Sequence, residues 1–149
     1  MEHPSKIIII DDNPDFRFTM ETFLKRNGFE TLTAENGQKG MDMIEKERPD
    51  LILLDVMMES TYSGFDVCKS VQSNPDLKDT PIIGISGMGA ELGVRPDKLE
   101  DDDYFRVDDF FEKPVDKGEL LDRIKELLAE GLVRKGKAVR IHNKIYIKK

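Results

Sequence analysis

The sequence lacks several features that would point to common protein classes. It has one cysteine in 149 residues, no tryptophan and two histidines. A single cysteine cannot form an internal disulfide, and with two histidines it supplies too few ligands for an ordinary zinc site. No apolar run exceeds about five residues, far short of the roughly 20 needed to span a bilayer. Disulfide-stapled, zinc-binding and membrane-spanning classes are therefore disfavoured.

The N-terminus, residues 1–4, also lacks the basic start and apolar stretch of a signal peptide. We therefore expect a protein of the reducing cytoplasm, with no membrane partner. Charged residues make up 36% and hydrophobic residues 38% of the chain, which is typical of a globular fold. A chain of this length can bury a sizeable core, and as a prior it forms one domain.

The charge of the chain is divided unevenly. The net charge is −7, yet residues 131–149 contain seven basic residues and no acidic one. Residues 1–130 therefore hold 16 basic and 30 acidic groups, which gives −14. An acidic body makes nucleic acid an unlikely main partner, although the tail leaves that question slightly open. We interpret residues 1–130 as the main domain and residues 131–149 as a basic C-terminal tail.

Short apolar runs bounded by turn residues indicate strands that are buried on both faces, as in a parallel sheet. The clearest run, Leu51–Leu54, leads directly into Asp55. A second run, Lys6–Ile10, leads into Asp11 and Asp12. Three further strands are predicted over Phe29–Ala34, Pro81–Ile85 and Asp109–Phe111.

Amphipathic segments alternate with these strands. Asn13 and Pro14 are typical of the N-cap and first position of a helix, and Asn27-Gly28 is typical of its end. Further helices are predicted over residues 37–47, 64–72 and 116–130, the last capped by Gly131, and one more is expected within residues 88–107. This alternation implies a parallel sheet with helices on both faces and right-handed crossovers.

Four predicted strands end in polar residues, which a parallel sheet would bring to one edge: Asp11 and Asp12, Asp55, Ser86 and Lys113. Converging carboxylates repel one another unless a hard dication lies among them, and oxygen-only ligands favour Mg²⁺. A lysine can pair with carboxylates or a phosphoryl group, and a serine hydroxyl can donate to a phosphoryl oxygen. Singly, each residue is more often a helix cap or a solvated turn residue; together they suit phosphoryl transfer to a carboxylate.

The chain resembles the receiver domain of two-component response regulators over about residues 6–130. The resemblance rests on four motifs: Ile-Ile-Asp11-Asp12-Asn13, Leu-Leu-Asp55-Val-Met-Met58, Ile-Ser86-Gly87 and Phe-Glu-Lys113-Pro114. It implies an α/β, flavodoxin-like, doubly wound fold with five parallel strands in the order 2-1-3-4-5. The short basic extension after this fold could form β structure of its own.

The same resemblance implies a role for each site residue. Asp55 would be the phosphoacceptor and a metal ligand. Asp12 would bind Mg²⁺ directly, Asp11 partly through water, and Met57 through its backbone carbonyl. Ser86 would bind the phosphoryl group.

The remaining implied roles surround the phosphoryl group. Lys113 would bind that group together with the backbone N–H groups of Val56 and Gly87. The peptide bond between Lys113 and Pro114 is expected to be cis. Phe110 stands at the position of the family's aromatic switch residue, which responds to Ser86.

These expectations describe a signalling switch. A partner histidine kinase or phosphotransfer protein would give a phosphoryl group to Asp55 in a Mg²⁺-dependent reaction, and the domain would shift between two pre-existing states toward an unknown downstream protein. The only catalysis expected is the self-catalysed phosphorylation and dephosphorylation of Asp55. Because the 19 residues after Glu130 are too few for an output domain, a stand-alone receiver is expected.

Two alternatives are left open. A Mg²⁺-dependent phosphohydrolase of the haloacid dehalogenase type also uses a strand-end aspartate, but it has a second acid two residues later. Met57 or Asn13 holds that position here, depending on whether Asp55 or Asp11 is the nucleophile; a phosphatase assay would separate the two classes. The other alternative is a receiver-like binding module that is not phosphorylated, which the complete set of site residues disfavours.

The tail alternates in polarity. Its apolar residues fall on odd positions: Val139, Ile141, Ile145 and Ile147. Alternation of this kind is typical of a strand with one buried face. His142-Asn143 could form a turn between two arms, or the segment could be one longer strand. We expect the tail to fold back on its domain or to pair across a homodimer; the alternative is a disordered basic tail.

Overall fold

The computed structural model describes residues 4–56, 64–87, 107–141 and 144–147. The chain divides into two compact units, Met1–Val115 and Asp116–Lys149, and each is described by itself. No helix within the described ranges is long and apolar enough to cross a membrane. The helix expected within residues 88–107 falls almost entirely outside the described residues.

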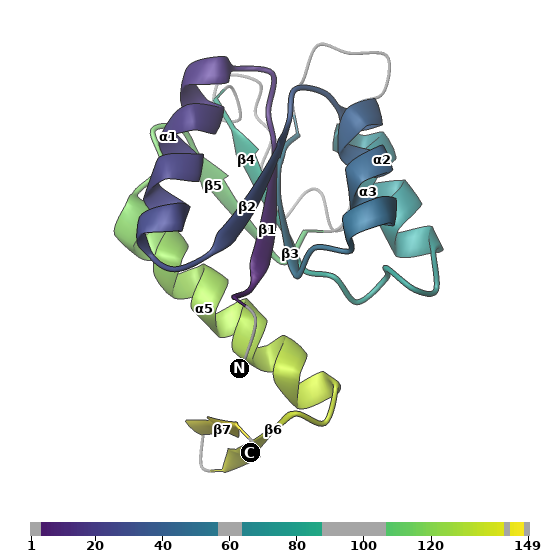
Figure 1. Ribbon diagram of the computed structural model, residues 1–149, viewed down its shortest axis with the longest axis vertical. Helices are drawn as coiled ribbons and strands as arrows, with labels where there is room; N and C mark the ends of the chain where they lie inside the picture. Colours follow the sequence, from purple (N-terminus) through teal and green to yellow (C-terminus); the bar gives the residue numbers. More distant parts are fainter. Residues whose placement is uncertain (1–3, 57–63, 88–106, 142–143, 148–149) are drawn as a thin grey trace. The chain divides into compact units, whose positions relative to one another are not determined.

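The first unit is built on one parallel sheet (Figure 1). Its strands are β1 (Lys6–Ile10), β2 (Glu30–Ala34), β3 (Leu51–Asp55), β4 (Ile82–Ser86) and β5 (Asp109–Glu112). They pair in the order β2-β1-β3-β4-β5, which confirms the predicted topology. β3 and β4 are buried at every residue, and this explains why their sequences read as continuous apolar runs.

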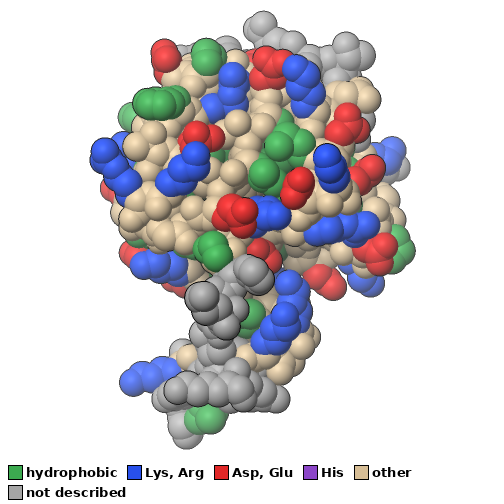
Figure 2. All heavy atoms as spheres, viewed as in Figure 1, with side chains coloured by type: hydrophobic (Ala, Val, Ile, Leu, Met, Phe, Trp, Pro, Cys, Tyr) green, Lys and Arg blue, Asp and Glu red, His purple; other side chains and the backbone are tan. Residues whose placement is uncertain are grey.

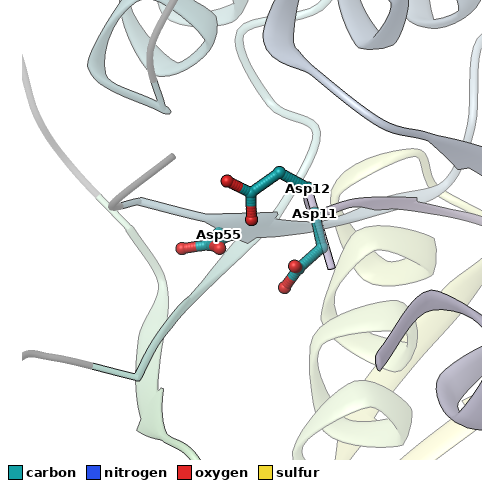
Figure 3. Close-up of side chains that lie close together, drawn as sticks. All are labelled: Asp11, Asp12 and Asp55. Carbon is teal, nitrogen blue, oxygen red and sulfur yellow. The ribbon is translucent and has the colours of Figure 1, made fainter. Parts of the chain in front are cut away.

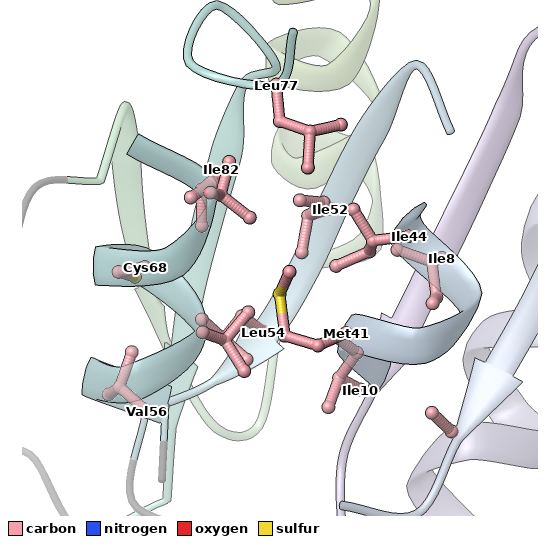
Figure 4. Close-up of a cluster of buried hydrophobic side chains, with 13 residues drawn as sticks. Ile8, Ile10, Met41, Ile44, Ile52, Leu54, Val56, Cys68, Leu77 and Ile82 are labelled. Atoms are coloured by element: carbon pink, nitrogen blue, oxygen red, sulfur yellow. The ribbon is translucent and has the colours of Figure 1, made fainter. Parts of the chain in front are cut away.

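Three described helices of this unit cover the sheet: α1 (Pro14–Arg26), α2 (Gly37–Glu47) and α3 (Gly64–Ser73). Figure 1 shows α1 on one face and α2 with α3 on the other. Because strand side chains alternate between faces, Ile8 and Ile10 join a core cluster with Met41 and Ile44 of α2 (Figure 4). Ile7 and Ile9 are equally buried on the opposite face.

The start of α1 follows the predicted capping pattern. The Asn13 side chain accepts hydrogen bonds from the N–H groups of Asp15 and Phe16 at 2.9 and 3.1 Å, and Pro14 is the first helical residue. Gly28 has φ +87°, so it provides the left-handed turn expected after the helix. Arg48, the residue that follows α2, takes the left-handed conformation with φ 50° although it is not glycine.

Two aspartates hold the opposite, amino-terminal edge of the sheet. Asp50 accepts the Lys6 N–H at 2.8 Å through its carboxylate and donates its own N–H to the Lys6 carbonyl at 2.7 Å. Asp108 makes the same pair of contacts with Ile82, at 2.8 and 2.7 Å. These reciprocal contacts extend the pairing of β1 with β3, and of β4 with β5, by one residue each.

The second unit consists of α5 (Lys117–Arg134), β6 (Ala138–Ile141) and β7 (Lys144–Ile147). The predicted end of this helix is wrong: Gly131 lies inside α5, which continues to Arg134. Gly136, with φ +73°, follows the helix instead. A glycine inside a helix costs only about 0.5–1 kcal/mol relative to alanine, so the sequence alone could not show which glycine ends it.

The tail forms an antiparallel pair of strands, so of the two predicted arrangements the two-arm one is present. The expectation that the odd-numbered apolar residues share one face is wrong for Ile141 and Ile145. Ile141 pairs with Lys144, and paired residues share a face, so Ile145 falls on the opposite face from Ile141. Because two residues separate the arms, odd-numbered residues of β6 pair with even-numbered residues of β7.

Candidate functional site

The carboxyl ends of four parallel strands bring the predicted site residues together. Asp11 follows β1, Asp55 ends β3, Ser86 ends β4 and Lys113 follows β5. The N–H of Lys113 donates to the Ser86 carbonyl at 2.9 Å, which ties the last two strand ends to each other. The Lys113–Pro114 bond is cis. The placement follows from parallel pairing alone, because all strands of such a sheet end at one edge.

Three carboxylates converge at this edge. Asp11, Asp12 and Asp55 each offer one oxygen, and these oxygens all lie within 4.8 Å of one another (Figure 3). Asp11 and Asp55 are 1% and 6% exposed, whereas Asp12 is exposed. Two buried carboxylates at this spacing repel each other strongly unless positive charge compensates them.

Lys113 supplies part of that positive charge. Its Nζ atom lies 2.9 Å from Asp11 Oδ2 and 3.8 Å from Asp55 Oδ2, and its side chain is 22% exposed. The ammonium group therefore stands beside both buried acids. One cation facing three carboxylates leaves net negative charge in the site.

The surroundings of Asp11 test whether a metal ion would fit. Its Oδ1 atom accepts the Asn13 N–H at 2.8 Å, and its backbone carbonyl accepts from Arg17 Nη1 at 2.7 Å. Its Oδ2 atom is buried and accepts no hydrogen bond from the described residues, although Lys113 pairs with it by charge. A hard dication such as Mg²⁺ prefers oxygen ligands. The three carboxylates, one of which has a buried oxygen without a hydrogen bond, therefore fit such an ion.

The other predicted residues lie around this cluster. Ser86 is fully buried, and Gly87 follows it directly. Met57 lies outside the described residues. The Val56 N–H donates to the Ile85 carbonyl at 3.0 Å. A phosphoryl contact at Val56 would therefore compete with a hydrogen bond of the sheet.

Phe110 lies on β5 opposite Gly84 of β4. A Cβ atom added to Gly84 would come within 3.2 Å of the Phe110 ring, so the ring packs directly over this glycine. Gly84 and Ser86 are two residues apart on β4 and therefore share a face of the sheet. The Phe110 ring and the Ser86 side chain consequently lie on the same side of neighbouring strands.

Sequence reasoning missed Phe16. The Lys113 ammonium lies 4.3 Å from the centre of its ring, which is within range of a cation–π contact. The only signal in the sequence was position, since Phe16 stands in the first turn of the helix that follows the two acids. An aromatic residue there reads equally well as core packing.

Residues 7–125 match the response regulator receiver domain family. "Probable transcriptional regulator ycf27" of Porphyra purpurea is 36% identical over 123 residues, which is 83% of this chain and 47% of that protein. "Protein PilH" of Pseudomonas aeruginosa is 28% identical, over 84% of this chain and 98% of that protein. The structure of the Vibrio cholerae chemotaxis protein CheY4 has a TM-score of 0.72 and 25% identity, and the match covers 83% of this chain and 98% of that one.

The chain therefore belongs to the response regulator receiver family. Receiver domains are phosphoacceptor signalling switches rather than enzymes in the usual sense, and this favours the signalling interpretation over a haloacid dehalogenase. The chain spans about half the length of the ycf27 relatives that it matches.

Proposed function

We propose that Asp55 accepts a phosphoryl group from a histidine kinase or a phosphotransfer protein. The observation that carries this proposal is the cluster itself: oxygens of three carboxylates within 4.8 Å of one another, with a lysine ammonium 2.9 Å from one acid and 3.8 Å from another. Nucleophile, metal ligands and cation then occur in one place. We place this reaction in the reducing cytoplasm, where a buried free thiol such as that of Cys68 stays reduced.

In the proposed reaction, a carboxylate oxygen of Asp55 attacks phosphorus. An O–P bond forms, and the bond from phosphorus to the donor breaks, with its electron pair leaving on the donor imidazole nitrogen or, for acetyl phosphate, on acetate. Lys113 pairs with the phosphoryl oxygens as they arrive, and Ser86 donates its hydroxyl hydrogen to one of them. Phosphorylated Asp55 then returns to the acid by hydrolysis.

Asp11, Asp12 and Asp55 would hold Mg²⁺, with the Met57 carbonyl as the further ligand that the family resemblance implies. When bound, Mg²⁺ supplies the positive charge that offsets repulsion between these acids and an incoming phosphoryl group. The Asn13 N–H occupies Asp11 Oδ1, and Asp11 Oδ2 accepts no hydrogen bond from the described residues. Asp12→Asn should therefore weaken Mg²⁺ binding, which titration calorimetry can measure.

Intact-protein mass spectrometry after incubation with acetyl phosphate tests the proposal. We expect a phosphate adduct in the wild-type protein with Mg²⁺, and none in Asp55→Asn or in the presence of a chelator. A phosphatase assay on small phosphoesters serves as a parallel control and should show no turnover. An adduct that survives in Asp55→Asn would overturn the assignment.

A second experiment tests the switch. If the phosphoryl group draws the Ser86 hydroxyl toward it, Phe110 should move into the space behind Ser86, because both lie on the same side of neighbouring strands. Ser86→Ala should still accept phosphate at Asp55 but show smaller NMR shift changes around Phe110. Equal shift changes in wild type and variant would count against this coupling.

A further inference from the structure

Four contacts join the first turn of α1 to Lys113 in a closed circuit. Asp11 Oδ1 accepts the Asn13 N–H at 2.8 Å, and Asn13 Oδ1 accepts the Phe16 N–H at 3.1 Å. The Phe16 ring lies 4.3 Å from Lys113 Nζ, and that Nζ lies 2.9 Å from Asp11 Oδ2. The circuit begins and ends on the same buried carboxylate.

The backbone side of this circuit is fixed. Asn13 caps the helix and Pro14 restricts its first turn, while Arg17 Nη1 donates to the Asp11 carbonyl at 2.7 Å. The backbone of Phe16 is therefore held in place relative to Asp11. Lys113 follows the carboxyl end of β5. Its side chain is long and flexible, so a further contact is needed to hold its ammonium group beside Asp11.

We propose that Phe16 is a positioning residue for Lys113. The inference rests on the proposed function, in which Lys113 meets the phosphoryl group. The face of an aromatic ring attracts an ammonium group but accepts no strong hydrogen bond from it. The ring therefore holds Nζ near the cluster and leaves its three N–H donors for Asp11, Asp55 or a phosphoryl oxygen.

The competing explanation is plain apolar packing of Phe16 against the lysine stem. Leucine would serve that purpose almost as well, whereas only an aromatic ring supplies the negative face. Phe16→Leu and Phe16→Tyr separate the two explanations, because both keep an apolar body and only tyrosine keeps the ring. Phe18→Leu is a matched control on the same helix, since Phe18 is 71% exposed.

The rate of Asp55 phosphorylation by acetyl phosphate is the first measurement. We expect Phe16→Leu to slow it by about two- to fivefold, as the loss of a partly exposed cation–π contact predicts. Phe16→Tyr and Phe18→Leu should both be phosphorylated at the wild-type rate. Equal slowing by leucine and tyrosine would overturn the proposal.

A double-mutant cycle shows whether the effect passes through Lys113. In a Lys113→Met background the ring has no ammonium to hold, so adding Phe16→Leu should cause no further slowing. The same fold-loss in both backgrounds would mean that Phe16 acts by another route, and the positioning role would be wrong.

An NMR measurement on the unphosphorylated protein keeps this test separate from the proposed function. Protons next to Lys113 Nζ lie over the face of the Phe16 ring, so they should be shifted upfield. The shift should vanish in Phe16→Leu and persist in Phe16→Tyr; its absence in the wild type would overturn the proposal. If the shift is present but Asp55 never accepts phosphate, the proposed function fails while the contact stands.

Discussion

At the scale of single residues, the end of β3, where Asp55 stands, has almost no free space beside Gly64. A Cβ atom at Gly64 would lie 2.7 Å from Val56 Cα and 2.9 Å from the Asp55 carbonyl oxygen. Both are backbone atoms, so no side-chain rotation can relieve the contact. The start of α3 can approach β3 this closely only because residue 64 has no side chain.

Gly64→Ala should therefore push the end of β3 away from α3. We expect a loss of about 1–3 kcal/mol in the free energy of unfolding, the usual cost of overpacking, with slower phosphorylation of Asp55. Gly131→Ala is the matched control: its Cβ would meet nothing nearer than Arg134 Nη2 at 3.7 Å. Inside α5 it should stabilise the protein by about 0.5–1 kcal/mol. Urea denaturation measures both, and similar effects would refute the steric argument.

Cys68 gives a second prediction at this scale. Burial raises the pKa of its thiol to about 12, and the negative charge of Asp108 adds to the effect. The folded protein therefore keeps this proton above pH 9, where the unfolded chain has begun to lose it. Stability should fall as pH rises from about 9 toward 12, and Cys68→Ala should lose less over that range. An equal loss of stability at high pH in the wild type and in Cys68→Ala would contradict this prediction. Alkylation of the Cys68 thiol at pH 8 at a rate faster than unfolding would also contradict it.

At the scale of elements, the strands were predictable because burial on both faces leaves a simple pattern. The apolar runs Lys6–Ile10 and Leu51–Leu54 fit buried strands better than any other element. The pair Asn13-Pro14 marks the start of α1. The edge at which Asp11, Asp55 and Lys113 meet then followed from parallel pairing.

What the sequence could not supply depends on contacts between distant residues. Arg48 caps the end of α2 in a conformation that favours glycine, and no local pattern in the sequence marks it. Gly131 resembles a helix end as much as Gly136 does. The register of β6 and β7 depends on how many residues separate the arms. The contact of Phe16 with Lys113 joins positions that the sequence gives no reason to pair.

The sheet edge opposite the site yields a prediction about pairing. Asp50→Ala would leave the partly buried Lys6 N–H without its acceptor, so we expect a loss of about 1–2 kcal/mol in the free energy of unfolding. Asp50→Asn keeps an acceptor oxygen and should lose less. Asp76→Ala is a control, because Asp76 is exposed and its ion pair with Arg48 spans 4.0 Å; it should change stability by less than about 0.5 kcal/mol. Chemical denaturation measures the three free energies of unfolding. Equal losses in all three variants would show that the hydrogen bond from the Lys6 N–H to Asp50 does not stabilise the sheet.

At the scale of the whole molecule, charge separates the tail from the rest of the chain. Residues 1–130 carry −14 and residues 131–149 carry +7. Figure 2 shows acidic and basic side chains interspersed over the visible face of the first unit, and basic side chains near β6 and β7. Ile141 of β6 is 50% exposed, so these strands do not bury all of their apolar residues.

Deleting residues 137–149 tests whether β6 and β7 contribute to stability by packing or by charge. The deletion removes five basic residues and no acidic one, which changes the net charge from −7 to −12. Because like charges destabilise a compact chain and salt screens them, the melting temperature should fall most at low ionic strength. Packing against the last turn of α5 should add a loss that salt does not reverse, with faster hydrogen exchange at residues 132–134.

Lys137→Gln with Lys144→Gln provides the control, because it lowers the net charge to −9 and leaves both strands in place. Lys137 precedes β6 and Lys144 begins β7, and both are exposed, so no buried contact is lost. This variant should reproduce part of the salt-dependent loss and none of the change in hydrogen exchange. If the deletion melts like the parent at every salt concentration, and exchange at residues 132–134 is unchanged, the two strands do not stabilise the protein. A change of oligomeric state in light scattering would instead point to the pairing of β6 or β7 with a second copy of the chain.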